Sequence, residues 1–155
     1  MGLDMWFWGN KTVSSSTFNT ETGTIETKQE FSDLLNSLNV PDTQVNSHFS
    51  WIRIQIPLIT WRKANAIHGW FVQNCQDGID DCRYAYVSQE QLQELIDLIK
   101  EALANKDSSS IKPTEGFFFG SSEIDDEYWD DLQKTLDTLE PLISEYEGFT
   151  YSSSW

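Results

Sequence analysis

The segment from residue 61 to residue 75 constrains the fold most, because its chemistry differs from that of the rest of the chain. It reads WRKANAIHGWFVQNC and is apolar, aromatic and cationic. No Asp or Glu occurs between Thr43 and Gln76, although the whole chain has 25 and a formal net charge of −15. At the helical repeat of about 100° per residue, its aromatic groups fall on opposite sides of a helix. A helix of that kind is normally covered, so we expect a buried central helix here.

One face of this predicted helix is apolar and contains a histidine. The face combines Trp61, Ala64, Ile67, His68, Phe71, Val72 and Cys75. Because His68 lies within this face, we expect its ring to be buried and hydrogen-bonded near Phe71, Trp61 and Cys75. Arg62 and Lys63 diverge by about 100°. We expect their charges to meet carboxylates of the acidic C-terminal half or a bound anion.

Length and composition predict a single domain over residues 1–155. A chain of this size buries roughly 68–70% of its unfolded surface, enough for a core without disulfides. Cys75 and Cys82 are separated by six residues, which matches neither a CxxC motif nor a zinc half-site, so free thiols are expected. No metal or cofactor is predicted. The sequence shows no apolar run long enough to cross a membrane and no signal peptide, which predicts the cytoplasm.

Periodicity predicts an α+β fold with a small antiparallel sheet covered by three main helices. Alternating apolar residues indicate strands at 2–8 and 49–56, the second ending at Pro57, and further strands at 84–87 and 117–119. A short helix is expected at 28–39. Ser88 and Gln91 form a capping box that begins a second helix, whose apolar stripe runs from Leu92 to Leu103. The last helix is expected from Glu123 to Glu140, capped by Ser121 or Ser122.

The remaining segments are predicted to be irregular. Residues 9–27 are rich in Ser and Thr and indicate a loop-rich excursion, residues 76–81 a solvated acidic turn, and residues 148–155 a mobile C-terminal tail. The acidic turn lacks the residue order of an EF-hand calcium loop. The GFFFG run at 116–120 is too short for a helix and indicates a buried strand or a close backbone approach.

Most of the negative charge is C-terminal. From Pro113 to Trp155 the chain has 11 carboxylates against Lys134 alone, a local net charge of −10. Residues three and four apart on a helix stand about 5–6 Å from one another, close enough to form a row of charge. The predicted row consists of Glu123, Asp126, Glu127, Asp130, Asp131 and Asp137. Such a row can imitate a nucleic-acid backbone and occupy a basic groove on another protein.

Several stretches, in this order, resemble a family of small phage-encoded proteins. They are MGLDMWFW at the start, WRKANAIHGWF at the centre, Tyr-Val-Ser before a helix, and GFFFGSSE followed by acids and Tyr-Trp. Residues 9–48 do not take part in the resemblance. It implies a phage accessory protein acting inside a bacterium, and it carries over no catalytic residue.

Two functions follow as hypotheses. The first is an acidic DNA mimic that binds and inhibits a host protein with a basic surface, such as a defence or nucleic-acid-handling protein, without binding nucleic acid or membrane itself. The second is a nucleotide or small-anion pocket on the central helix. That pocket would use Trp61, Arg62, Lys63, Asn65, His68, Trp70 and Phe118. The sequence offers no nucleophile with its base, no phosphate-binding glycine loop and no metal-ligand spacing, which favours binding over catalysis.

Overall fold

The computed structural model describes residues 2–41 and 50–155, and the chain divides into two compact units. The larger unit consists of Met1–Asn10 and Gln55–Trp155, and the smaller unit of Lys11–Ile54. Strands β1 (Asp4–Ser14) and β4 (Trp51–Arg62) each continue from one unit into the other. The predicted α+β class is confirmed by a four-stranded antiparallel sheet, a two-stranded sheet and four helices.

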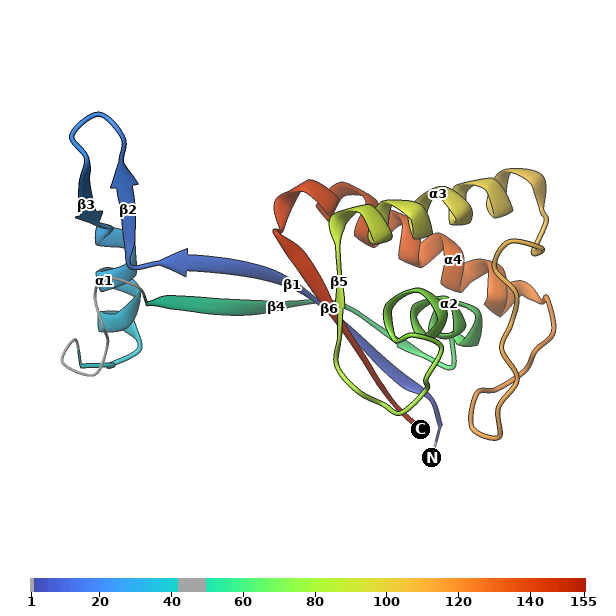
Figure 1. Cartoon of the computed structure of the whole chain (residues 1–155). Coiled ribbons are helices and arrows are strands. Elements are labelled where there is room, and N and C mark those ends of the chain that lie inside the picture. The colour runs from blue at the N-terminus through green and yellow to red at the C-terminus, as the bar shows by residue number, and fades with distance from the viewer. Residues whose placement is uncertain (1, 42–49) are drawn as a thin grey trace. The chain divides into compact units, whose positions relative to one another are not determined.

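The four-stranded sheet has the order β4-β1-β6-β5, with β5 at Ala85–Val87 and β6 at Gly148–Ser154 (Figure 1). Strand β6 pairs antiparallel with both neighbours, so that Tyr151 lies opposite Phe7 on one side and Ala85 on the other. The expectation of a mobile tail at 148–155 is therefore wrong. Residues 148–154 form an inner strand instead, because Phe149 and Tyr151 are fully buried in the core.

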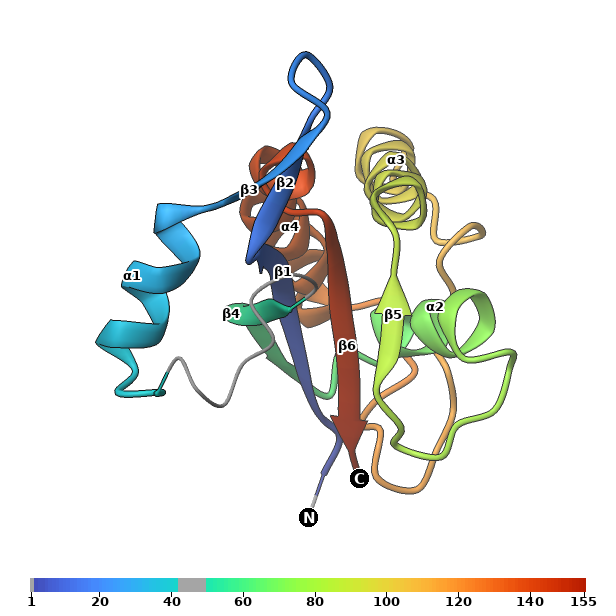
Figure 2. The ribbon, with the colours of Figure 1, turned by 60° about the vertical axis from the view of Figure 1, so that its left-hand side comes forward.

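Alternation in β1 explains which face of the sheet is covered. Met5 and Phe7 are fully buried, whereas Trp6 and Trp8 on the opposite face are only partly buried. Phe7 stacks on Phe149, with ring centroids 5.3 Å apart, and contacts Phe71 of the central helix. Figures 1 and 2 show the three helices α2, α3 and α4 on this side of the sheet.

Strand β4 is longer than the sequence indicated. It runs through Pro57 to Arg62, whereas Pro57 was expected to end it; the predicted start at residue 49 lies outside the described residues. β4 is an end strand of the sheet, where a residue without an N–H is tolerated. Trp61 therefore belongs to β4 and not to the central helix. After Lys63, in the left-handed region at φ 63°, helix α2 begins and spans Asn65–Cys75.

The other two helices of the larger unit are α3 (Gln89–Asn105) and α4 (Asp126–Leu139). The predicted capping box of α3 is confirmed, since Ser88 accepts from the backbone of Gln91 and the Gln91 side chain accepts from the backbone of Ser88. Helix α4 starts later than predicted. Its cap is the Asp125 side chain, which accepts from Tyr128 N at 3.1 Å, and not Ser121 or Ser122. A 3-10 turn, η2 (Glu140–Glu145), follows α4.

The smaller unit contains strands β2 (Ser16–Asn19) and β3 (Thr24–Thr27) and helix α1 (Gln29–Ser37). Helix α1 confirms the helix predicted at 28–39 and buries Phe31 and Leu35. The prediction that residues 9–27 form a loop is wrong, because the end of β1 and the β2–β3 hairpin lie there. Both faces of the hairpin are largely exposed, so its sequence carries no alternation of apolar and polar residues.

Candidate functional site: an acidic cleft between two helices

A cleft of about 130 Å³ lies between the first turns of α2 and α4. It brings part of the cationic central segment together with part of the acidic C-terminal segment. Its lining includes Lys63 and Asn65 from the start of α2, Gly120 and Ser121 from the preceding loop, and the carboxylates of Glu123, Asp125, Glu127 and Asp131. One lysine thus faces four carboxylates, and the cleft favours a cationic group over an anion.

Asp131 is the carboxylate that the cleft perturbs most. Burial, followed by the neighbouring charge of Glu127, raises its pKa from 3.8 to about 6, while Lys134 acts in the opposite direction. The Lys134 ammonium donates to the carbonyl of Thr60 at 3.0 Å. Within residues 2–41 and 50–155, Asp131 forms no ion pair. In the unbound protein its negative charge is therefore poorly compensated.

Replacing Asp131 by asparagine is expected to stabilise the protein at pH 7.5 by about 1 kcal/mol, a value kept small because solvent partly screens this group. A raised folded-state pKa means that the folded protein binds the extra proton between pH 4 and 6. The wild type therefore loses stability as the pH rises through that window. Urea unfolding should show equal stability of the two proteins near pH 4 and a gap at pH 7.5. Asp137→Asn, at an exposed site, is the control and should show no such gap.

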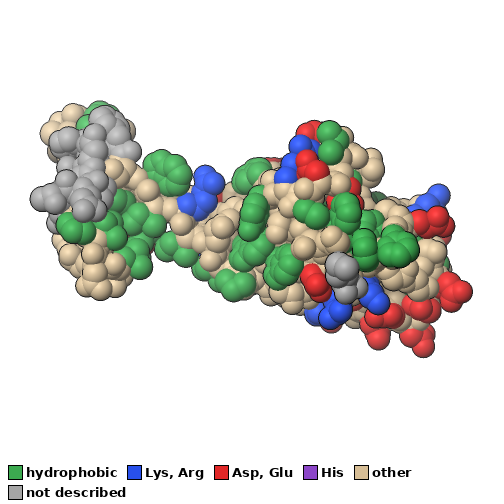
Figure 3. All heavy atoms as spheres, turned by 90° about the horizontal axis from the view of Figure 1, so that it is seen from below, with side chains coloured by type: hydrophobic (Ala, Val, Ile, Leu, Met, Phe, Trp, Pro, Cys, Tyr) green, Lys and Arg blue, Asp and Glu red, His purple; other side chains and the backbone are tan. Residues whose placement is uncertain are grey.

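The six predicted partner-binding carboxylates do not form one row. Asp126, Asp130 and Asp137 lie on α4 and are exposed. Glu127 and Asp131 line the cleft instead, together with Glu123, which precedes the helix. Figure 3 shows acidic side chains gathered at the right-hand end of the larger unit. The structure thus offers an outward set of three carboxylates and a cleft set of three.

The predicted anion pocket is not assembled around a single cavity. Trp61 is buried and its indole N–H donates to Thr135 Oγ1 at 2.8 Å, and Trp70 is also buried. Arg62 is exposed and lies 3.9 Å from Asp4. The expected partner was a carboxylate of the C-terminal half or a bound anion, and the observed one is an N-terminal carboxylate instead. Phe118 is half-buried. Of the seven predicted pocket residues, only Lys63 and Asn65 line the cleft.

Asn65 holds the loop before α4 in place rather than facing a ligand. Its buried amide donates to the carbonyls of Phe119 and Ser121, at 3.1 and 2.7 Å, and its oxygen accepts from Thr114 N at 3.3 Å. These bonds use both the donor and the acceptor of the side chain. Asn65 therefore positions the loop that forms one wall of the cleft.

His68 is fully buried, as predicted, and both of its ring nitrogens are hydrogen-bonded. Nδ1 lies 2.7 Å from the Tyr151 hydroxyl and Nε2 lies 2.9 Å from Asp80 Oδ2. A carboxylate oxygen accepts, so Nε2 donates to Asp80, and in the neutral imidazole Nδ1 then accepts from the Tyr151 hydroxyl. Asp80 also accepts from the Trp155 indole at 3.1 Å. The sequence placed Asp80 in a solvated turn, and that expectation is wrong for this residue.

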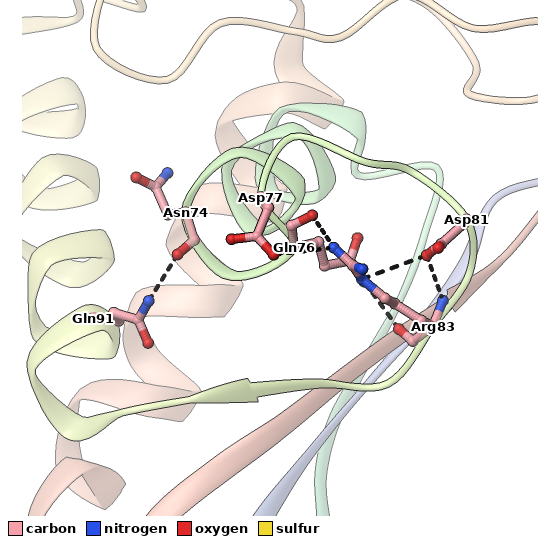
Figure 4. Close-up of polar contacts among 6 residues, drawn as sticks. All are labelled: Asn74, Gln76, Asp77, Asp81, Arg83 and Gln91. Atoms are coloured by element: carbon pink, nitrogen blue, oxygen red, sulfur yellow. Dashed lines mark hydrogen bonds and ion pairs between the residues drawn. The ribbon is translucent and has the colours of Figure 1, made fainter.

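The turn that carries Asp80 is fixed by Arg83 (Figure 4). The Arg83 side chain donates to the carbonyl of Gln76 and lies 3.5 Å from Asp77 and 3.6 Å from Asp81, while the Gln76 amide donates back to the Arg83 carbonyl at 2.9 Å. Gln91 at the start of α3 donates to the carbonyl of Asn74 at the end of α2, at 2.7 Å. The end of α2, the turn and α3 are thereby joined, which holds Asp80 against His68.

Both cysteines of the chain are half-buried. Cys75 and Cys82 are free thiols, as predicted. Burial, followed by the charge of Glu94, raises the pKa of Cys75 to about 12, so the thiol stays protonated and unreactive at neutral pH. The described residues contain no group of three or more His, Cys, Asp or Glu that could hold a metal ion.

Comparison with family models, with curated proteins and with solved structures gives no match. Among the described residues, no helix has the length and apolar character needed to cross a bilayer.

Proposed function

We propose that the protein binds a basic surface of a host protein, in place of the nucleic acid that this surface would otherwise hold, and inhibits it. The observation that carries the proposal is the arrangement of the six α4-region carboxylates into an outward set and a cleft set. Asp126 and Asp130 are one helical turn apart, a spacing of about 5–6 Å that suits a row of Lys and Arg side chains. The resemblance to phage-encoded proteins supports a target inside a bacterium.

The acidic cleft is also a binding site for one basic side chain of the partner. A Lys or Arg entering between Glu127 and Asp131 would supply the compensating charge that Asp131 lacks in the unbound protein. A cation favours the ionised form of a nearby carboxylate, so binding would lower the pKa of Asp131 and release any proton it holds. Affinity should accordingly fall as the pH drops below about 6.

The alternative, a nucleotide or anion pocket, receives no such support. A phosphate in the cleft would face four carboxylates and a single lysine. The other cationic group of the predicted pocket, Arg62, is exposed beside Asp4, and both ring nitrogens of His68 are already bonded. We therefore do not propose anion binding.

The test reverses the outward set by the triple substitution Asp126→Lys, Asp130→Lys and Asp137→Lys. These side chains are exposed, so each change should alter the free energy of unfolding by no more than about 0.5 kcal/mol. Capture of the partner from a bacterial lysate should fall at least about tenfold at low salt, chiefly through the association rate. Added DNA or heparin should release the partner from the wild type, because polyanions would compete for the same basic surface.

The matched control reverses three exposed carboxylates of α3, by Glu94→Lys, Asp97→Lys and Glu101→Lys. Both triple variants change the net charge by the same amount, so bulk charge is held constant. The α3 variant should capture the partner like the wild type. If both variants lost capture of the partner equally, the net charge alone would explain binding. Unchanged capture by the α4 variant at low salt would rule out mimicry.

A further inference from the structure

The turn at residues 116–120 presents a single, almost fully exposed phenylalanine. Phe117 is 95% exposed, more than any other large apolar side chain among the described residues. The sequence indicated a buried strand or a close backbone approach here. Residues 117–119 form a turn, not a strand, in which only Phe119 is buried, and the backbone approach is seen between Leu3 N and the carbonyl of Phe118. Burial of a phenylalanine side chain is favourable, and in the free protein this gain is not used, so a partner that covers Phe117 would obtain it.

Backbone hydrogen bonds fix this turn on the C-terminal side of Phe117, at Phe118 and Phe119, and link Phe119 back to Gly116. The carbonyl of Phe118 accepts from Leu3 N at 3.0 Å, the carbonyl of Phe119 accepts from the Asn65 amide, and Phe119 N donates to the carbonyl of Gly116 at 3.1 Å.

Side-chain packing fixes the turn further. The Phe119 ring packs edge-on against His68 at 4.9 Å, and the Phe117 and Phe118 rings meet edge-to-face, also at 4.9 Å. At Gly116 any Cβ would collide with the Phe119 ring, and Gly120 has a φ of 88° that disfavours other residues. Phe117 is thus held outward on a rigid support, which lowers the entropy lost when it binds.

The charge around the turn defines the partner that it fits. From Glu115 to Asp131 the chain has seven carboxylates and no Lys or Arg, and the cation that packs against the turn, at Gly120, is Lys63. Gly120 and Ser121, at the end of the turn, also line the acidic cleft. An anionic lipid surface would repel this segment. A protein pocket that is apolar inside and ringed by Lys and Arg is complementary to both features.

We infer that Phe117 is the anchor of the interface: it enters an apolar pocket on the basic partner while the carboxylates of the cleft pair with cations around that pocket. Interfaces take most of their affinity from a few central residues, typically aromatic ones, surrounded by polar contacts. This inference rests on the proposed function, and it adds the position of the anchor and an apolar pocket to the description of the partner.

The experiment uses the basic protein that the wild type captures, identified by mass spectrometry and purified, and measures binding kinetics to Phe117→Ala and Phe117→Leu. Phe117→Ala should weaken binding about 30-fold or more, the scale of an interface hot spot, mainly through faster dissociation. Phe117→Leu, which keeps an apolar side chain, should retain most of the affinity. The loss should persist at high salt, unlike the effect of charge reversal.

The matched control is Phe18→Ala, at a phenylalanine that is 62% exposed on the hairpin of the smaller unit, and its binding should equal that of the wild type. A photo-crosslinking phenylalanine analogue at position 117 should crosslink to apolar residues of the partner. Thermal unfolding of Phe117→Ala should match that of the wild type, because the side chain is not part of the core.

The possible failures are distinguishable. If charge reversal on α4 abolishes binding but Phe117→Ala binds like the wild type, the anchor is wrong and the proposed function stands. If the wild type captures no basic protein, both are wrong. Phe117-dependent binding to vesicles that contain phosphatidylglycerol would also overturn the inference, because the partner would then be a lipid surface.

Discussion

Truncation of the chain after Glu147 is expected to leave the protein unfolded. The deletion removes β6, an inner strand that pairs with β1 on one side and β5 on the other. It also removes the buried rings of Phe149 and Tyr151. Loss of each buried aromatic side chain costs about 3–5 kcal/mol, before the lost strand pairing is counted, against a total stability of about 5–15 kcal/mol for a typical domain. Circular dichroism and thermal scans should show no cooperative transition.

The control for this truncation is deletion of Trp155 alone. That deletion removes the indole hydrogen bond to Asp80 but leaves β6 and both of its ladders intact. The shortened protein should fold and melt cooperatively, at a somewhat lower temperature. A cooperative transition in the chain that ends at Glu147 would mean that β1 and β5 close the sheet without β6, contrary to the observed strand order.

Substitution of His68 by alanine should lower the free energy of unfolding by about 3 kcal/mol. The ring is fully buried, so its removal creates a cavity and leaves the Tyr151 hydroxyl and the Asp80 carboxylate without their partner. Urea unfolding monitored by tryptophan fluorescence measures the loss. Unchanged stability together with lost partner binding would make His68 a functional residue instead of a structural one.

Two substitutions at Asp80 separate the hydrogen bond from the charge. Asp80→Asn keeps an oxygen that can accept from His68 Nε2, so a loss below about 1 kcal/mol is expected. Asp80→Ala leaves a buried N–H unpaired and should cost about 1–3 kcal/mol. Combining Asp80→Ala with His68→Ala should cost less than the sum of the single changes, because the two side chains share one interaction.

Local signals in the sequence were sufficient for several elements. The capping box at Ser88 and the apolar stripe from Leu92 onward define α3, because both depend only on residues close in sequence. The alternation of Met5 and Phe7 with Trp6 and Trp8 likewise predicts the start of β1. These elements each bury a single face, and their periodicity records which face it is.

The elements that the sequence did not predict depend on distant partners. Strand β6 reads GFTYSSS, and its three serines are typical of a solvated tail. In the structure Ser152 and Ser153 are buried, because β6 pairs with β1 on one side and with β5 on the other. Asp125 offers the same kind of cap as Ser121 and Ser122, because Asp is as good an N-cap as Ser, so the sequence alone does not separate the three positions. Nothing local shows that Asp80 turns inward to His68, since that contact depends on how the turn packs.

The candidate site was only partly predictable for a similar reason. The sequence indicated that the last helix is acidic. The positions of its carboxylates around the helix also separate those that face outward from those that border the apolar stripe. Glu127 and Asp131 directly precede Tyr128 and Leu132, which are buried, so they border the apolar stripe and can line a cleft. The other wall comes from α2 and from the loop that Asn65 holds, and this long-range pairing left no pattern in the sequence.

The position of β6 has a consequence for how the chain is made. In the sheet Asp4 pairs with Ser154. Strand β1 therefore leaves the ribosome early, whereas its neighbour β6 is synthesised only when almost the whole chain is complete. During synthesis the edge of β1 that will pair with β6 stays open to other strands, a state that invites aggregation or chaperone binding. Contacts between such distant residues also slow folding. Incomplete translation products therefore lack the inner strand of the sheet, and only chains that include residues 148–154 can complete the fold that positions α4.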